Sequence, residues 1–427
     1  MTGRFMKHRF KPKGSVIAAL DIGSSKIACF IARTVDDEGH YEILGIGHQA
    51  SQGVKSGAVV DLGAAEQSIR QAVHSAEHMA AEAMKGYPLR EVMINVPGTL
   101  ARSHNMTIDA EINGREIGDN DIRRAMATAQ EQSLSDDSEL VHTIPVGYAV
   151  DGHNGVRDPR GMYGERMAVD LHMVTGETGA LRNIATCIER SHLDIGALCL
   201  SSYAAGLSSL VEDEKDLGCT VIDMGGGVTS IAVFYGGSMI FSDAVPVGGR
   251  HVTSDIARGL TTALGDAERL KVLYGSAIAS ITDENELIDV PQIGEDNRSH
   301  PNHAPRSLLV GIIQPRLEEV LEIVRARLHD SGIGAAAGRR VVLTGGASQL
   351  PGIRDLAQNV LDKQVRLGKP VNCAGLADAV SGPAFATTAG LLAYISERSH
   401  EMPAEIMAQV QPETLFERIQ FWLRENW

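Results

Sequence analysis

Short apolar runs that lead into an aspartate and a glycine- or serine-rich turn occur twice in the chain, half a chain apart. Residues 16–20 and 26–31 are apolar and partly β-branched, with a polar turn between them. Residues 219–223 and 228–234 repeat this arrangement around a turn of three glycines. Runs of this length and composition predict β-strands, so each pair predicts a hairpin. Two such hairpins predict a duplicated architecture.

Helical and extended patterns alternate through the rest of the chain. Helices are predicted at residues 62–84, 119–132, 179–191, 253–264, 266–274, 308–331 and 387–398, and further strands at 91–96 and 340–344. Asp119 is the expected N-cap of its helix, and Pro315 is expected to break the long helix that contains it. Polar segments at 152–164, 212–216 and 282–305 are expected to be exposed turns or loops. The alternation in both halves predicts an α/β fold.

Length and charge narrow the classes of protein. The 427 residues are too many for one ordinary core, and 43% hydrophobic with 22% charged residues is typical of a globular protein. A net charge of −15 argues against non-specific nucleic-acid binding. No apolar stretch approaches the ~18 residues of a membrane span, so any membrane contact is expected from the side.

The five cysteines are odd in number and form no CxxC pair. Cys29, Cys199 and Cys219 lie in or beside apolar runs, which predicts buried free thiols rather than disulfides or a zinc site. This pattern fits a reducing cytoplasm.

The basic run at the start of the chain has two interpretations, a solvated arm or a weak contact with acidic lipid. Its residues are Arg4, Lys7, Arg9, Lys11 and Lys13.

The repeated hairpins suit a phosphate ligand. Glycine lets backbone approach an anion, and successive N–H groups of a turn form an anion nest. The hydroxyls of Ser24, Ser25 and Thr229 add donors, and Asp21 and Asp223 can hold waters on Mg²⁺. A single hairpin of this kind is more often a tight turn without a ligand. Its repetition with aspartate in the same place favours the phosphate interpretation.

Two further motifs are weak alone. Gly345-Gly346 follows a strand and precedes a helix, which allows a flat base or a phosphate to pack on the backbone. Any tight turn between strand and helix can also need two glycines. Glu268 and Lys271 share a helix face and could clasp a ribose or a base, although such a pair is more often a surface ion pair.

In combination, and in this order, these motifs resemble the actin/DnaK/sugar-kinase superfamily. Within it, the segments at 142–152 and 158–167 are similar to the extra subdomain of the FtsA family. The segments at 212–214, 252–257 and 288–291 also resemble that family. The resemblance covers roughly residues 15–395 and the tail.

The resemblance implies an actin-like two-domain fold with duplicated nucleotide-binding halves, an FtsA-type inserted subdomain and a C-terminal amphipathic helix. The expected parts are a basic arm (1–14), the first half (15–89 and 173–215), the inserted subdomain (90–172), the second half (216–246 and 336–398), its outer subdomain (247–335), a linker (399–411) and a membrane-targeting helix (412–427).

The resemblance also assigns ATP and Mg²⁺ to particular residues. Gly23, Ser24, Ser25 and Lys26 would hold the β- and γ-phosphates, and Gly225, Gly226, Gly227 and Thr229 would face them. Gly248 and Gly249 would lie close to the nucleotide, Glu268 and Lys271 would touch the ribose or base, and Gly345 and Gly346 would pack on the adenosine. Asp21 and Asp223 would hold Mg²⁺ through water.

Two positions depart from the superfamily pattern. Ser201 stands where relatives often carry a water-activating side chain, and Val228 stands where they often carry threonine. Without a positioned general base, hydrolysis loses a factor on the order of 10²–10⁴. We therefore expect ATP binding with slow turnover at most.

The tail is amphipathic when wound as a helix. With successive residues about 100° apart, one apolar stripe falls within about 140°. Phe421 lies off this stripe and Asn426 falls within it, so the pattern is imperfect. The tail predicts an interfacial membrane helix, and the alternative is a helix packed on its own domain. The stripe consists of Leu415, Phe416, Ile419, Trp422, Leu423 and Trp427.

The resemblance therefore implies a cell-division scaffold at the septum. It would bind ATP, form actin-like filaments with other copies, tether FtsZ to the lipids of the inner membrane on its cytoplasmic face, and meet other division proteins. Two alternatives stay open at this point. One is a small-molecule kinase of the same superfamily, and the other is a PilM-like scaffold of pilus assembly.

Overall fold

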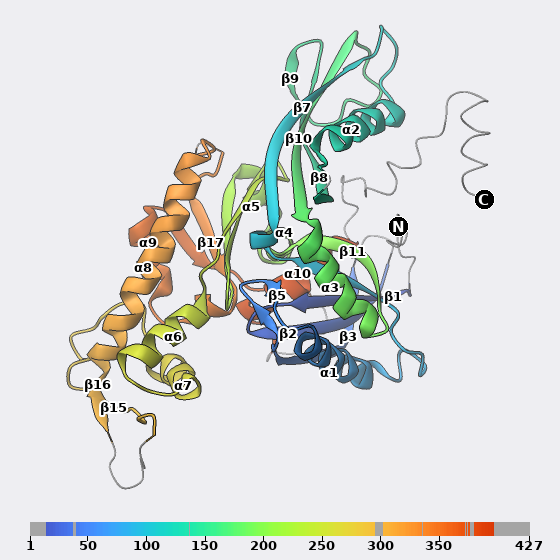
Figure 1. Ribbon diagram of the computed structural model, residues 1–427. Helices are drawn as coiled ribbons and strands as arrows, with labels where there is room; N and C mark the ends of the chain where they lie inside the picture. Colours follow the sequence, from blue (N-terminus) through green and yellow to red (C-terminus); the bar gives the residue numbers. More distant parts are fainter. Residues whose placement is uncertain are drawn as a thin grey trace.

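Two sheets with the same strand order divide the chain into similar halves (Figure 1). The computed structural model describes residues 14–36, 40–135, 137–294, 302–334, 336–371, 373, 375 and 380–396. Within them, one five-stranded sheet has the order β11-β6-β1-β2-β3 and the other the order β18-β17-β12-β13-β14. In each, the central strand pairs antiparallel with its hairpin partner and parallel with its other neighbour. The predicted α/β duplication is confirmed.

The first half is a sheet covered on both faces. Ala18, Leu20 and Ile22 alternate toward α1 and α3, while Ile17 and Ala19 face α4 and α10. Burial on both faces explains why these strands read as unbroken apolar runs. The elements are β1 (Val16–Ile22), β2 (Lys26–Thr34), β3 (Tyr41–Ala50), β4 (Val54–Lys55), β5 (Ala58–Val59), α1 (Leu62–Ala80), β6 (Glu91–Val96), α3 (Thr178–Arg190), β11 (Asp194–Leu200) and α4 (Ser201–Ser209).

An inserted sheet with one helix projects from the first half and forms the upper arm of the molecule in Figure 1. Its strand order is β7-β10-β8-β9, and α2 packs on one face over a core of its own. The Ser103 hydroxyl donates to the Ser242 carbonyl of β14 at 2.7 Å, so the insert also touches the second half. The elements are β7 (Ala101–Glu111), α2 (Asp119–Ser133), β8 (Ser138–Val150), β9 (His153–Val156) and β10 (Arg166–Glu177).

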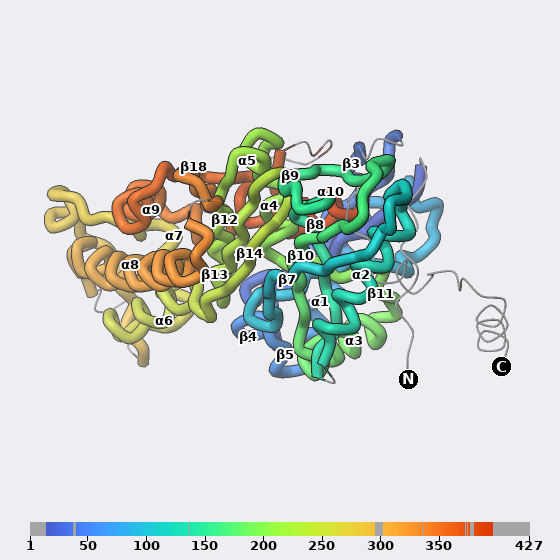
Figure 2. The backbone as a smooth tube through the Cα atoms, turned by 90° about the horizontal axis from the view of Figure 1, so that it is seen from above, coloured from blue at the N-terminus to red at the C-terminus, as the bar shows by residue number. Residues whose placement is uncertain are grey.

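The second half repeats the first and adds an outer helical layer, which lies on the side of the second sheet away from the first half in the view from above (Figure 2). Ile222 and Met224 face this layer, while Cys219 and Val221 face α4. The elements are α5 (Glu212–Leu217), β12 (Cys219–Met224), β13 (Thr229–Tyr235), β14 (Ser238–Val245), α6 (Gly249–Gly259), α7 (Leu264–Tyr274), β15 (Leu287–Asp289), β16 (His303–Pro305), α8 (Arg306–Asp330), β17 (Arg340–Thr344), α9 (Ile353–Leu361), β18 (Gln364–Leu367) and α10 (Ala386–Ser396).

Three local predictions were wrong. Gly118, not Asp119, caps α2, because the Asp121 carboxylate accepts the Gly118 N–H at 3.0 Å. The acidic turn at 212–216 is the short helix α5, since carboxylates favour a helix N-terminus and Glu214 accepts the Val211 N–H. Pro315 does not break α8, because buried side chains before and after it hold the helix in its core.

Two of the expected turns contain strands. In the segment 152–164, β9 pairs with β8, and in the segment 282–305, β15 pairs with β16.

The predicted buried thiols are confirmed: Cys29, Cys199 and Cys219 are buried, and no disulfide joins any of the five cysteines. Among the described helices, none is long and apolar enough to cross a membrane. Residues 1–13 of the predicted basic arm (1–14), the predicted linker (399–411) and the tail (412–427) lie outside the described residues.

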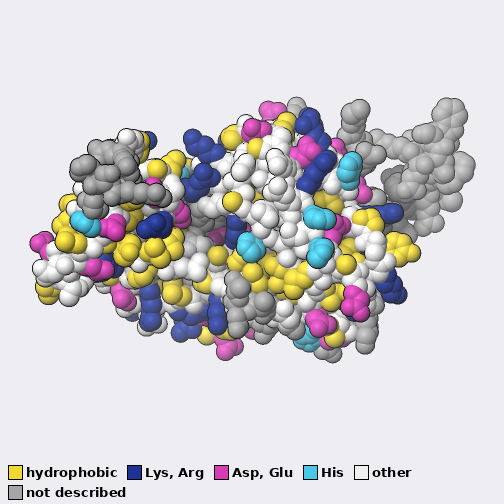
Figure 3. All heavy atoms as spheres, turned by 90° about the horizontal axis from the view of Figure 1, so that it is seen from below, with side chains coloured by type: hydrophobic (Ala, Val, Ile, Leu, Met, Phe, Trp, Pro, Cys, Tyr) yellow, Lys and Arg dark blue, Asp and Glu magenta, His cyan; other side chains and the backbone are white. Residues whose placement is uncertain are grey.

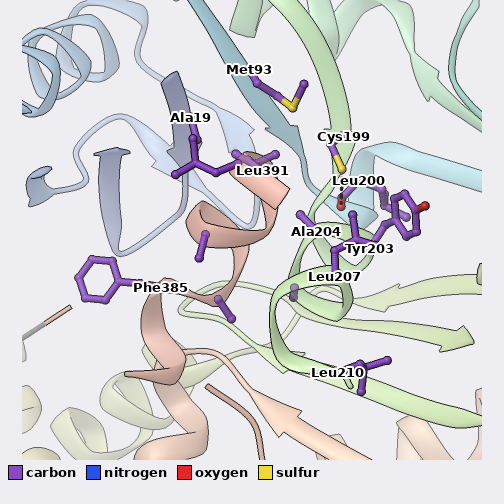
Figure 4. Close-up of a cluster of buried hydrophobic side chains, with 14 of the residues drawn as sticks. Ala19, Met93, Cys199, Leu200, Tyr203, Ala204, Leu207, Leu210, Phe385 and Leu391 are labelled. Atoms are coloured by element: carbon purple, nitrogen blue, oxygen red, sulfur yellow. Dashed lines mark hydrogen bonds between the residues drawn. The ribbon is translucent and has the colours of Figure 1, made fainter. Parts of the chain in front are cut away.

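Helices α4 and α10 fill the space between the two sheets (Figure 4). Leu391 of α10 lies beside Ala19 and Met93 of the first sheet, while Ala204 and Leu207 come from α4. The backbone of α4 lies where a side chain at position 390 of α10 would be. A β-carbon at Gly390 would lie 1.7 Å from the Ala204 carbonyl oxygen. The glycine is therefore required for this close approach.

Because of this packing, a glycine-to-alanine substitution should have opposite effects on the free energy of unfolding in α10 and in α8. Gly390→Ala should lower the free energy of unfolding by about 1–3 kcal/mol, because the added methyl group overpacks the α4–α10 contact. Gly311→Ala is the matched control, since nothing lies within 4 Å of a β-carbon there. It should raise stability by about 0.5–1 kcal/mol through helix propensity. Urea denaturation measures both, and equal effects would contradict the packing account.

Candidate functional site

The two strand-end aspartates meet at one cavity between the halves. Asp21 lies near the end of β1 and Asp223 near the end of β12, and both line a cavity of about 450 Å³, here called the cleft cavity. The surface is hollowed between the lobe with α7 and the lobe with α1 in the view from below (Figure 3). A volume of this size is typical of a small-molecule site.

Helix α10 reaches both aspartates with adjacent threonines. The Thr388 hydroxyl donates to Asp21 Oδ2 at 3.2 Å, and the Thr387 hydroxyl donates to Asp223 Oδ2 at 3.1 Å. Lys26 Nζ lies 3.3 Å from Asp21 Oδ2 and 4.4 Å from the centre of the Phe385 ring. The two carboxylates therefore have fixed positions, and each keeps oxygen lone pairs for another ligand.

The two hairpin turns have the same hydrogen bond. The Gly23 N–H donates to the Lys26 carbonyl at 3.0 Å, and the Gly225 N–H donates to the Val228 carbonyl at 2.9 Å. Lys26 and Val228 are thus equivalent positions in the two halves. The first turn therefore has a cationic side chain at this position, and the second turn has an apolar one.

The hairpin tips touch each other across the cleft. A β-carbon at Gly226 would lie 1.8 Å from Ser25 Oγ, so only glycine fits there. The Arg250 guanidinium, at the start of α6, donates to the Ser24 carbonyl oxygen at 2.6 Å and joins the halves at the same place. Any side chain at Gly226 would push the tips apart.

The outer part of the cleft cavity contains the predicted pair on α7. Lys271 Nζ lies 2.7 Å from Glu268 Oε2 and donates to the Gly249 carbonyl at 3.1 Å and to the Thr253 hydroxyl at 2.8 Å. The ion pair that the sequence left open is therefore present, and it joins α7 to α6. Both side chains also line the cavity, so the two interpretations coexist.

Gly345 is the point where β17 meets the cavity floor. Its φ of +85° is a conformation that favours glycine, and a β-carbon there would lie 2.3 Å from Asp223 Oδ1. Gly346 begins a short 3₁₀ turn that also lines the cavity. This glycine pair therefore has a packing reason and also leaves an open backbone surface.

Most of the predicted site residues surround this one cavity. Thr229 does not line it: its hydroxyl donates to the Val247 carbonyl at 2.8 Å, and Ser230 lines the cavity instead. Gly248 does not line it either and packs behind the glycine turn, where a β-carbon would meet the Gly225 carbonyl at 2.5 Å. The lining includes Asp21, Gly23, Ser24, Ser25, Lys26, Asp223, Gly225, Gly226, Gly227, Gly249, Glu268, Lys271, Gly345 and Gly346.

Sequence reasoning missed several polar residues of the site, among them Thr387, Thr388 and Asn95. Thr387 and Thr388 carry no motif, since their role depends on where α10 packs. Asn95 carries a signal, because it lies near the carboxyl end of β6, which runs parallel to β1, and such ends meet at one edge. It lines the cavity, and its Oδ1 accepts the Ile22 N–H at 2.7 Å.

The hydroxyl of Ser201 takes part in structural hydrogen bonds. Its hydroxyl donates to the Val96 carbonyl at 3.1 Å and accepts from Asn95 Nδ2 at 3.1 Å. The carboxamide of Asn95 thus has both ends occupied by Ile22 and Ser201. A hydroxyl and an amide are not strong bases, and slow turnover stays a prediction.

The residues fit a Mg²⁺–nucleotide bound through water. In the described part of the chain, no group of three or more His, Cys, Asp and Glu side chains could hold a metal directly. Two carboxylates alone suit Mg²⁺, which keeps several waters and takes further oxygens from phosphates. Backbone N–H groups of the two turns would supply the surface for phosphate.

The electrostatics of the site raise the proton affinity of one aspartate. The pKa of Asp223 is raised to about 6, first by burial and then by repulsion from Asp21, against smaller opposing effects of Thr387 and Lys26. The ionised form of Asp223 is therefore unfavourable in the ligand-free protein.

A pH-dependent stability follows from this shift. Asp223 binds its proton more tightly when folded, so its stabilising effect is full below pH ~4 and is lost as pH rises through about 6. Asp223→Asn should therefore raise the melting temperature at pH 7.5 and change it little at pH 4.5. The gain in the free energy of unfolding at pH 7.5 should be at most about 3 kcal/mol. The assay is thermal melting in EDTA without nucleotide. Asp194→Asn, at an exposed position, is the control, and an Asp223→Asn effect independent of pH would contradict the shift.

Comparisons with known proteins agree with this architecture. The family model described as cell division protein FtsA matches residues 220–390, and the model described as the SHS2 domain inserted in FTSA matches residues 98–175. Among solved structures, the PilM-PilN type IV pilus biogenesis complex is similar with a TM-score of 0.64 at 17% identity, covering 89% of this chain and 98% of that one. MreB5 of Spiroplasma citri bound to ADP is similar with a TM-score of 0.52 at 12% identity, covering 89% and 95%. These two likenesses show the actin-like fold.

Curated relatives are similar over nearly the whole chain. Cell division protein FtsA of Rhizobium meliloti (strain 1021) is 42% identical over 98% of this chain and 97% of its own length. Cell division protein FtsA of Escherichia coli (strain K12) is 32% identical over 96% of this chain and 98% of its own length. With the inserted SHS2 sheet and the duplicated halves around the cleft, the chain belongs to the family of the cell division protein FtsA.

Proposed function

We propose that this protein is an ATP-binding scaffold of bacterial cell division that works at the membrane. The observation that carries the nucleotide part is the pair of equivalent aspartate-bearing hairpins at one cavity. The similar fold of MreB5 was solved with ADP, which supports a nucleotide in a fold of this kind. Membership of a family of division proteins supports the division site as the place of action.

The chemistry of the lining suggests how the ligand would lie. Ser24, Ser25 and Lys26 would hold the outer phosphates from one side, and the turn at Gly225–Gly227 would face them. Asp21 and Asp223 would accept from the waters of Mg²⁺. Lys271, Gly345 and Gly346 would border the sugar and base. Bound Mg²⁺ supplies positive charge that favours the ionised form of Asp223.

Hydrolysis is proposed to be slow. The two groups nearest the expected position of a base, Ser201 and Asn95, are a hydroxyl and an amide with structural partners. Family membership sets aside the small-molecule kinase and the PilM-like scaffold, and no feature of the cavity favours either. Rapid phosphorylation of a small molecule would contradict this part of the proposal.

The scaffold part rests on the family and on the tail. The amphipathic stripe on residues 415–427 would attach the protein to the cytoplasmic face of the inner membrane, and FtsZ would be its partner there. A single short helix gives modest affinity, so self-association into filaments would strengthen attachment by avidity.

The nucleotide proposal predicts stabilisation by Mg²⁺–ATP. At a ligand concentration of 100 times Kd, bound nucleotide adds about 2.7 kcal/mol to the free energy of unfolding, which thermal melting detects. Gly226→Val should abolish the shift, because its side chain would collide with Ser25. Gly179→Ala, with nothing within 4 Å of its β-carbon, should keep the shift. A folded Gly226→Val protein with an undiminished shift would sink the site assignment.

The membrane proposal predicts a loss of liposome binding from one tail substitution. Trp422→Glu places a charge in the apolar stripe and should abolish co-sedimentation with liposomes without lowering affinity for ATP, because none of the residues proposed to hold the nucleotide belongs to the tail. Glu417→Gln, on the polar side of the tail, is the matched control and should bind as the unmodified protein does. Equal binding by both variants would show that the stripe is not the membrane contact.

A further inference from the structure

A second cavity lies at the opposite end of the first sheet from the cleft. It has a volume of about 530 Å³ and is here called the rear cavity. The starts of β1 and β6, the segment 83–90 before β6, and Gly196 and Ala197 of β11 line it, together with Ile395 of α10. The parallel strands β1, β6 and β11 therefore begin at the rear cavity, and β1 and β6 carry the residues of the cleft at their other ends.

The lining of the rear cavity is largely apolar. Val16, Ile17, Met84, Leu89 and Met93 contribute to it. Tyr87 stands on its rim with 74% of its surface exposed. Exposed apolar surface in a hollow of this size is typical of a place where another group binds. None of the residues proposed to contact the nucleotide or Mg²⁺ lines the rear cavity.

The charge on the rim is mainly positive. Lys85 and Arg90 line the cavity with one acidic residue, Glu91. Arg33, whose guanidinium donates to the Ala83 carbonyl at 3.3 Å, and Glu77, whose carboxylate accepts the Leu89 N–H at 2.7 Å, also lie nearby. Three cations and two carboxylates leave a net charge of +1 around the cavity. An apolar segment with a small negative charge fits such a rim better than a basic one.

The chain itself supplies a segment of this kind. Ile395 lines the rear cavity, and α10 ends one residue later at Ser396. The linker from there to Pro412 spans at most about 55 Å when extended, so the tail can return to the cavity. The tail carries three glutamates and two arginines, a side-chain charge of −1, whereas the arm at residues 1–13 is basic.

We propose that the rear cavity is an intramolecular docking site for the apolar stripe of residues 415–427. Leu415, Phe416, Ile419 and Trp422 would enter the cavity when no bilayer is present. One apolar face cannot contact both partners, so docking and membrane insertion exclude each other. Docking then lowers the apparent affinity for lipid by the fraction of molecules in which the tail is free. The inference uses the amphipathic pattern of the tail and does not depend on nucleotide binding.

Tryptophan fluorescence tests docking directly. The two tryptophans of the chain, Trp422 and Trp427, are both in the tail, so emission reports on this segment alone. In lipid-free buffer, Tyr87→Glu should shift emission to the red and increase quenching by acrylamide, because a charge on the rim repels the tail. Ala197→Asp, inside the cavity, should do the same. Leu217→Glu is the matched control, an 80% exposed residue on α5, and should change neither reading.

Liposomes separate this proposal from the membrane proposal. If docking competes with lipid, Tyr87→Glu should reach half-maximal liposome binding at a lower lipid concentration than the unmodified protein. Emission in buffer that neither cavity variant alters would overturn docking and leave the basic arm or a second copy as the occupant. An absence of any lipid effect in all variants would instead contradict the membrane anchor and leave docking standing.

Discussion

The arrangement of the two halves depends on one interaction, the pair of hydrogen bonds that α10 donates to the two strand-end aspartates. Thr388 and Thr387 are adjacent in the chain, yet their hydroxyls reach Asp21 in one half and Asp223 in the other. Two equivalent carboxylates would repel each other across the cleft. Two donors on one helix, with Lys26 beside Asp21, reduce that repulsion and fix the width of the site. The pKa of Asp223 is nevertheless raised, first by burial and then by repulsion from Asp21, against smaller opposing effects of Thr387 and Lys26.

The same helix joins distant parts of the molecule. The helix has 11 residues, and the eight steps from Thr387 in the cleft cavity to Ile395 in the rear cavity rise about 12 Å along its axis. Along this length Gly390 allows contact with α4, and Tyr394 packs edge-on against His142 of the inserted sheet. The cleft cavity, the inserted sheet and the rear cavity therefore share contacts with one helix. A change in the separation of the aspartates would act on all three.

Much of the fold was predictable from local pattern. The strands around Asp21 and Asp223 are buried on both faces, so their apolar runs were unbroken, and their repetition predicted the duplicated halves. The cleft residues with motifs followed from the same turns. The failures have separate causes: the cap of α2 was set by Asp121 reaching back to Gly118, and Pro315 was tolerated because tertiary packing outweighed one lost hydrogen bond.

Residues whose role depends on packing between distant elements were not predictable. Thr387 and Thr388 have no local signature, and the rear cavity arises from four segments that are far apart in the chain. Thr229 shows the converse case, in which a residue in the expected motif turns its hydroxyl to the backbone of Val247.

The central claim is that a nucleotide-binding core carries a partner to a membrane through its tail. Co-sedimentation of FtsZ with liposomes, in the presence of this protein and Mg²⁺–ATP, tests it most directly. The account predicts that FtsZ pellets with the liposomes when the unmodified protein is present, and stays in the supernatant with Trp422→Glu or without the protein. FtsZ that remains in the supernatant with the unmodified protein, or pellets equally with Trp422→Glu, would contradict it.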